Sequence, residues 1–239
     1  DFGAQGLSNL AHGFAKQCIR NPPAMEVLAG EAARALSAFT NQELSATAWA
    51  FAKLALSPQA FIHAAAEEVK RRMPDLIPQD LAMLAWSFAH LDSPKSKHAL
   101  EEISWEVMKQ AQHLDPQDLT NICWAFATAG FENAMMMNAL AQEVAKKVDR
   151  FTAQDLSNTA WAFAKLGLAE DDMFDAISVE VTRKVGTLLP QNLSIISWAY
   201  AKLGLLNDDM MEAVAGEIVR KIGEFDGQGI GNVLWSYAV

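Results

Sequence analysis

Residues 156–167 read LSNTAWAFAKLG, and versions of this stretch recur along the chain. His12 begins the series 37 residues before the first tryptophan of the column. The column continues, at intervals of 37, 38, 37, 37 and 37 residues, through Trp49, Trp86, Trp124, Trp161, Trp198 and Trp235. Self-similarity at a fixed period of this length is typical of a helical-repeat protein. We therefore expect six whole repeats and a truncated seventh.

Each repeat is predicted to hold two helices. Thr152 and Asp155 form the pattern of a capping box at the start of the first helix, and Asp115 followed by Pro116 is another strong start signal. Gly130, Gly167 and Gly204 stand where glycine commonly ends a helix. Because one hairpin cannot bury both its faces, neighbouring repeats must stack. The fold class predicted is all-α, a right-handed α-solenoid (αα superhelix) of about 37-residue helical hairpins.

We expect residues 1–239 to form one continuous array. The chain begins without methionine and stops inside a motif, so we expect it to be a segment of a longer protein. No apolar run approaches the roughly 18 residues needed to cross a bilayer, which predicts a soluble protein without a membrane span. Cys18 and Cys123 lack CxxC partners, and the histidines lack ligand spacing, so no metal site, no cofactor and no enzymatic activity are predicted.

One face of the first helix is predicted to be buried. At about 100° per residue, Leu156, Ala160, Phe163, Ala164 and Gly167 share a sector, with Trp161 at its edge. The second helix carries a glutamate followed three residues later by a basic residue, which predicts ion pairs on a solvated face. These pairs are Glu31–Arg34, Glu68–Arg71, Glu106–Lys109, Glu143–Lys146, Glu180–Arg183 and Glu217–Arg220.

The opposite face of the first helix carries three polar columns. The glutamine column is Gln5, Gln42, Gln79, Gln117, Gln154, Gln191 and Gln228. The largely cationic column is Lys16, Lys53, His90, Thr128, Lys165, Lys202 and Val239. Between them runs a variable column: Asn9, Ala46, Met83, Asn121, Asn158, Ile195 and Asn232. Lysine can contact phosphate while the variable residue meets a base, so this pattern favours a reader of single-stranded RNA.

Every column also has a purely structural explanation. The glutamines could cap helices or bridge neighbouring repeats, and the tryptophans could pack between repeats rather than provide stacking platforms. The lysines could simply be solvated. The net charge of −10 is unusual for a nucleic-acid binder and favours a protein–protein scaffold in a large complex as the alternative.

The helix LSNTAWAFAKLG resembles the repeats of the octotricopeptide and heptatricopeptide families, and the resemblance extends over essentially the whole chain. It implies binding of single-stranded RNA in a mitochondrion or plastid, for maturation, stabilisation or translation of transcripts. Some relatives instead serve as subunits of mitochondrial ribosomes or other assemblies. On the RNA reading, the candidate contacts are Lys16, Lys53, Lys165, Lys202, Asn9, Asn121, Asn158, Asn232, Gln42, Gln79, Gln117, Gln154 and Gln191.

Overall fold

A computed structural model describes residues 3–205 and 207–239, and all regular structure in that part of the chain is helical. Two kinds of α-helix alternate, as the repeat predicts. The first helices are α1 (Ala4–Lys16), α3 (Asn41–Lys53), α5 (Pro78–His90), α7 (Pro116–Ala129), α9 (Ala153–Leu166), α11 (Pro190–Leu203) and α13 (Gly227–Ser236). The second helices are α2 (Pro22–Ala35), α4 (Gln59–Arg72), α6 (Pro94–Gln110), α8 (Ala134–Lys147), α10 (Asp171–Lys184) and α12 (Asp208–Arg220).

A single 3-10 turn follows every second helix and leads into the next repeat. These turns are η1 (Leu36–Ala38), η2 (Met73–Asp75), η3 (Ala111–His113), η4 (Val148–Arg150), η5 (Val185–Thr187) and η6 (Ile222–Glu224).

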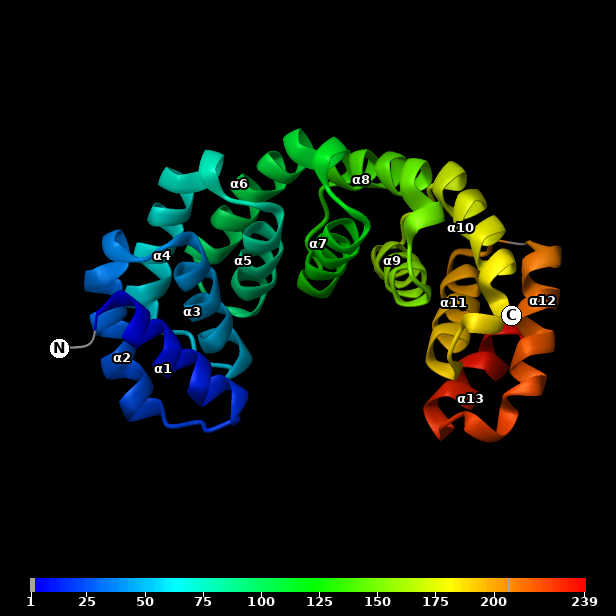
Figure 1. Ribbon diagram of the computed structural model, residues 1–239, viewed down its shortest axis with the longest axis horizontal. Coiled ribbons are helices and arrows are strands. Elements are labelled where there is room, and N and C mark those ends of the chain that lie inside the picture. Colours follow the sequence, from blue (N-terminus) through cyan, green and yellow to red (C-terminus); the bar gives the residue numbers. More distant parts are fainter. Residues whose placement is uncertain (1–2, 206) are drawn as a thin grey trace. The chain divides into compact units, whose positions relative to one another are not determined.

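The chain forms two compact units, residues 1–110 and residues 111–239. In the first unit, α1, α3 and α5 pack in succession and α2, α4 and α6 form a second row. In the second unit, α7, α9, α11 and α13 form one row and α8, α10 and α12 the other (Figure 1). The predicted all-α solenoid is therefore confirmed. Its right-handed twist and its continuity over residues 1–239 stay predictions.

Local signals set the helix ends. The Thr152 hydroxyl accepts a hydrogen bond from the Asp155 backbone N–H, and the Asp155 carboxylate accepts one from the Thr152 N–H, as the capping box predicts. Asp115 caps α7 in the same way. Gly130, Gly167 and Gly204 end their helices with φ of +59°, +73° and +67°, a conformation that only glycine adopts without strain.

The buried face of α9 is wider than predicted. Leu156, Ala160, Phe163 and Ala164 are fully buried, as expected, but so are Ser157, Thr159 and Ala162. The placement of Gly167 on the buried face was wrong: it is exposed at the helix end. A first helix contacts two neighbouring first helices as well as second helices, so its buried surface wraps around more than one sector.

The glutamates of the second helices do more than form exposed ion pairs. All six predicted i,i+3 pairs are present. Yet Glu180 is buried and also pairs with Lys184, whose Nζ lies 2.6 Å from the Phe151 carbonyl oxygen and 3.2 Å from that of Asp149. Lys184 thereby joins its own second helix to the start of its repeat. The solvated-face interpretation is wrong here.

We call this arrangement the carbonyl clamp: a buried or half-buried glutamate, the basic residue four positions later, and two backbone carbonyls of the turn that precedes the first helix of the same repeat. It recurs with Glu143 and Lys147, and with Glu217 and Lys221. Arg72 plays the same part with Glu68 in the first unit. In α6, Gln110 takes the basic position and only donates to Glu106.

Substitution of a core residue and of a stripe residue on α9 should separate the two faces. Phe163→Ala removes a fully buried ring and should cost about 3–5 kcal/mol in the free energy of unfolding, through lost burial and a cavity. Lys165→Ala removes an exposed side chain and should change it by less than about 0.5 kcal/mol. Thermal unfolding followed by circular dichroism measures both. Equal shifts would contradict the face assignment.

Loss of one clamp should be measurable. Lys184→Met leaves two carbonyls and the buried Glu180 with fewer partners, so we expect a cost of about 1–3 kcal/mol. Lys146→Met is the matched control because Lys146 is exposed and makes only the i,i+3 pair, worth about 0–1 kcal/mol. Chemical denaturation of both variants gives the difference, and a cost no larger for Lys184 than for Lys146 would refute the clamp's role.

The clamp also makes stability depend on acid. Hydrogen bonds from Arg220 and Lys221 hold the pKa of Glu217 at about 2, below its ordinary 4.5. A lowered folded-state pKa stabilises the fold above about pH 4.5, and this contribution is lost as the pH falls towards 2. Melting temperatures between these pH values should therefore fall less in Glu217→Gln than in the wild type. Glu212→Gln, at an exposed position without an ion pair in the described structure, should follow the wild type.

Candidate nucleic-acid interface

The polar columns form one exposed stripe on each first helix. On α9, Gln154, Asn158 and Lys165 occupy positions i, i+4 and i+11, which an α-helix brings to the same side. Gln154 and Lys165 are exposed and Asn158 is half-buried. Trp161, at i+7, lies on this side too and is half-buried. We refer to these four columns as the stripe.

The glutamines of the stripe are available to a ligand. All seven are exposed, and within residues 3–205 and 207–239 no side chain among them makes a hydrogen bond. Capping is done instead by Thr40, Asp115 and Thr152. Bridging between first helices is done by buried pairs beneath the stripe, such as Ser45 with Asp80 at 2.9 Å and Ser157 with Asn192 at 3.0 Å. The alternative in which the glutamines cap or bridge is wrong.

The lysines of the stripe are free cations. Lys16, Lys53, Lys165 and Lys202 are exposed, and none forms an ion pair in the described structure. Most basic residues of the second helices are neutralised by nearby carboxylates, as Lys184 is by Glu180. The three other members of this column differ: His90 stacks on Trp86, the Thr128 hydroxyl donates to the Ala125 carbonyl, and Val239 is apolar.

Within the first helices, acidic residues stand at the glutamine end of the stripe and not at its lysine end. The acidic residues within first helices are confined to the first turn, where they favour the helix dipole: Glu43, Asp80, Asp118 and Asp155. The remaining acids of the described residues lie in second helices and connecting segments, among them Glu170 and Asp171, which follow Lys165 by five and six residues.

The variable column is partly accessible along its whole length. Asn9 and Asn121 are exposed; Asn158 and Asn232 are half-buried, as are Ala46, Met83 and Ile195. None of the four asparagine side chains makes a hydrogen bond in the described residues. Their amide groups can both donate and accept, which suits the edges of nucleobases.

Two clefts in the second unit lie along the stripe. One, of about 450 Å³, opens between α7 and α9 and is lined by four amides, by Arg150 of η4 and by the carboxylates Asp115 and Asp155. Its amide lining is Gln117, Asn121, Gln154 and Asn158. Nothing in the sequence pattern singled out Arg150, because it belongs to the connecting turn and not to the repeated helix.

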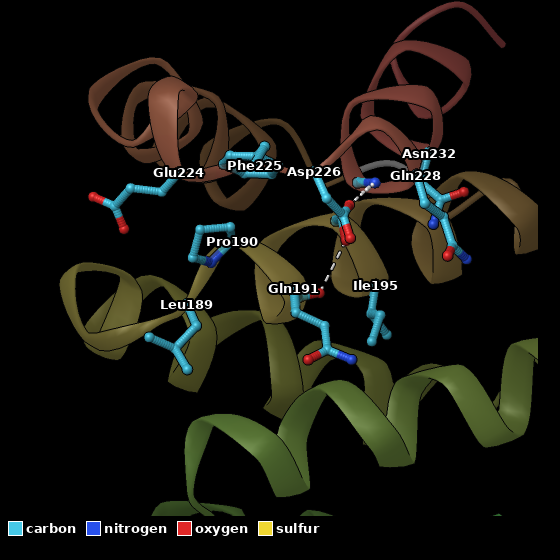
Figure 2. Close-up of a pocket in the computed structure, with 11 residues that line it drawn as sticks. Leu189, Pro190, Gln191, Ile195, Glu224, Phe225, Asp226, Gln228 and Asn232 are labelled. Atoms are coloured by element: carbon cyan, nitrogen blue, oxygen red, sulfur yellow. Dashed lines mark hydrogen bonds between the residues drawn. The ribbon is translucent and has the colours of Figure 1, made fainter.

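The second cleft, also about 450 Å³, lies between α11 and α13. Figure 2 shows Gln191 and Ile195 side by side on α11, and Gln228 and Asn232 side by side on α13. Here Glu224 and Asp226 are the charged lining residues. Each cleft thus has two glutamines of the stripe, and the two clefts differ in their charged residues and in the variable column.

No helix of the described residues is long and apolar enough to span a membrane. Among curated proteins, no match to the chain was found. Kinship with the octotricopeptide and heptatricopeptide repeats stays a prediction. A family model described as RNA-editing substrate-binding complex 6 protein matches residues 58–239. Because this match covers well over half of the chain and most of its repeats, the protein belongs to the family of RNA-editing substrate-binding complex 6 proteins.

Proposed function

We propose that this chain is a non-catalytic RNA-binding subunit that holds single-stranded RNA along the stripe of its first helices. The observation that carries the proposal is the set of free lysines and free amides on one side of those helices. Cations without protein partners neutralise phosphates at little cost, whereas a paired lysine must first give up its carboxylate. Amides without partners can bond base edges.

The family supports the same proposal, since its printed description names RNA editing and a substrate-binding complex. We infer that the chain acts inside such a complex, on transcripts being edited, and that it works in a mitochondrion. The asparagine positions contribute selectivity because amides distinguish base edges, while Ala46, Met83 and Ile195 can only pack against a base face. The repeats with asparagine therefore discriminate between bases, and the repeats with an apolar residue accept different bases.

Binding to protein subunits is the second candidate function. Its specific support is the set of exposed apolar side chains on second helices, among them Trp105, Val179 and Val219. Large exposed apolar groups often belong to contact surfaces. These residues lie on second helices rather than on the stripe, so a protein partner and an RNA strand can use different parts of the same chain.

Removal of two stripe lysines should weaken RNA binding in a salt-dependent way. Each phosphate contact adds about 0.7 to the slope of affinity against salt, or roughly fourfold in affinity near 0.15 M. We therefore expect Lys165→Ala with Lys202→Ala to bind single-stranded RNA about tenfold more weakly and to lower the slope by about 1.4. Fluorescence anisotropy at several salt concentrations measures both quantities.

Lys97→Ala is the control, because Lys97 is an exposed lysine of α6 without an ion pair in the described structure, and it lies outside the stripe. It should bind like the wild type. If the double variant and the control behave alike, the stripe does not carry the binding. If the wild type binds no RNA and crosslinking of the native protein recovers none, the protein-binding function takes its place.

A further inference from the structure

Four tryptophans of the second unit belong to the stripe, and three of them, Trp124, Trp161 and Trp198, are partly exposed between well-buried neighbours. Trp124 is 37% exposed although its neighbours Cys123 and Ala125 are 0% and 1% exposed. Trp161 and Trp198 are half-buried between fully buried neighbours. Each indole therefore rises out of the buried surface on the side that also carries the free amides. Complete burial, which packing alone would favour, is not reached at any of these positions.

These three indoles also lack partners for the groups that recognise ligands. In the described residues, no aromatic ring or cation lies against Trp124, Trp161 or Trp198, and no group accepts from their N–H. The N–H groups of Trp161 and Trp198 are not enclosed either. In the described residues no cation–π contact joins Lys165 to Trp161, four residues earlier. Partly exposed indoles without ring or cation partners thus lie on three successive helices, α7, α9 and α11.

In the first unit, an aromatic ring of the protein itself stacks on the indole at the equivalent position. On α5, the imidazole of His90 stacks on Trp86 with ring centroids 4.2 Å apart and planes 28° apart. His90 occupies the column that holds Lys165 and Lys202 in the second unit. The indole N–H of Trp86 is enclosed without a hydrogen-bond partner. A flat nitrogen heterocycle of this protein therefore already covers the surface that stays open on α7, α9 and α11.

We propose, as a deepening of the RNA-binding function above, that Trp124, Trp161 and Trp198 are stacking platforms for unpaired bases of single-stranded RNA. Aromatic stacking is tolerant of sequence because every base has a π face. Selectivity then comes from the neighbouring amides, and attraction from Lys165 and Lys202, which stand one helical turn beyond Trp161 and Trp198. The tryptophans hold the bases where the amides can bond their edges and the lysines can contact the phosphates.

The spacing of the platforms selects the form of the nucleic acid. Packed helices lie about 8–10 Å apart, whereas stacked bases of one strand rise about 3.4 Å each. Bases on successive platforms therefore cannot remain stacked on one another, and a duplex cannot present them at all. The second unit accepts a strand whose bases are already separated, which describes an unstructured single strand.

Two substitutions per platform separate stacking from packing. Leucine at Trp161 and Trp198 keeps apolar volume but removes the π face, and phenylalanine keeps a smaller π face. We expect Trp161→Leu with Trp198→Leu to lower affinity for a single-stranded RNA by at least tenfold, and the paired phenylalanine variant to recover most of it. Trp105→Leu, at a 46% exposed tryptophan on α6, should leave affinity unchanged.

An abasic strand gives a readout that does not depend on folding of a variant. The wild-type chain is titrated with an RNA oligonucleotide and with a sugar–phosphate oligomer of equal length and charge but without bases. Stacking predicts at least tenfold weaker binding of the abasic strand and quenching of tryptophan fluorescence by RNA alone. Equal affinity for the two strands, with the leucine variants binding as the wild type does, overturns the platforms and leaves RNA binding intact. Absence of RNA binding by the wild type overturns both.

Discussion

In α8, α10 and α12, a lysine held between a buried carboxylate and two backbone carbonyls ties the second helix to its repeat. Glu180 fixes Lys184, and Lys184 reaches the carbonyls of Asp149 and Phe151 that lie 35 and 33 residues earlier. Those carbonyls belong to the turn into the first helix of the same repeat, so the contact sets where that helix begins. The capping box of Thr152 follows directly. In this repeat the contact joins α10 to the segment just before α9, the helix that carries the stripe.

The ion pair of Glu180 with Lys184 differs from the exposed pairs because its carboxylate is buried. An exposed pair such as Glu31 with Arg34 is screened by water and holds nothing else in place. Glu180 is removed from water and bonded by both Arg183 and Lys184, and these bonds lower its pKa. The same distribution leaves the lysines of the first helices without carboxylates. The repeat pattern thus places glutamates beside the basic residues of the second helices and none beside the lysines of the first helices.

The fold could be read from the sequence because period, caps and glycines all act locally. Thr152, Asp155 and Gly167 perform their expected local roles, and the buried positions of Phe163 and Ala160 follow from helical periodicity. Contacts that span some 35 residues could not be read in this way. The i+4 lysine is visible in the sequence, but its target is a backbone carbonyl, which leaves no mark on residue identity.

For the candidate site, the glutamine and lysine columns were predicted on the face opposite the core, and Gln154 and Lys165 are exposed there, whereas Asn158 and Asn232 are half-buried. Trp161 was predicted at the edge of the buried face, and its half-buried side chain confirms this; its i+7 spacing from Gln154 also places it on the stripe. Arg150 lies outside the repeated helix, and no pattern could have found it.

The lysine of the clamp binds main-chain oxygen atoms, and this affects how the number of repeats in such a protein can change. A lysine that recognises carbonyl oxygens does not require a particular side chain in the turn, as the different residues at Gln112, Asp149 and Gly186 show. Duplication or deletion of one complete repeat in a gene would then leave every remaining clamp with a valid target. The residues of the stripe could then diverge between repeats while the carbonyl clamps continued to work in every repeat that has one.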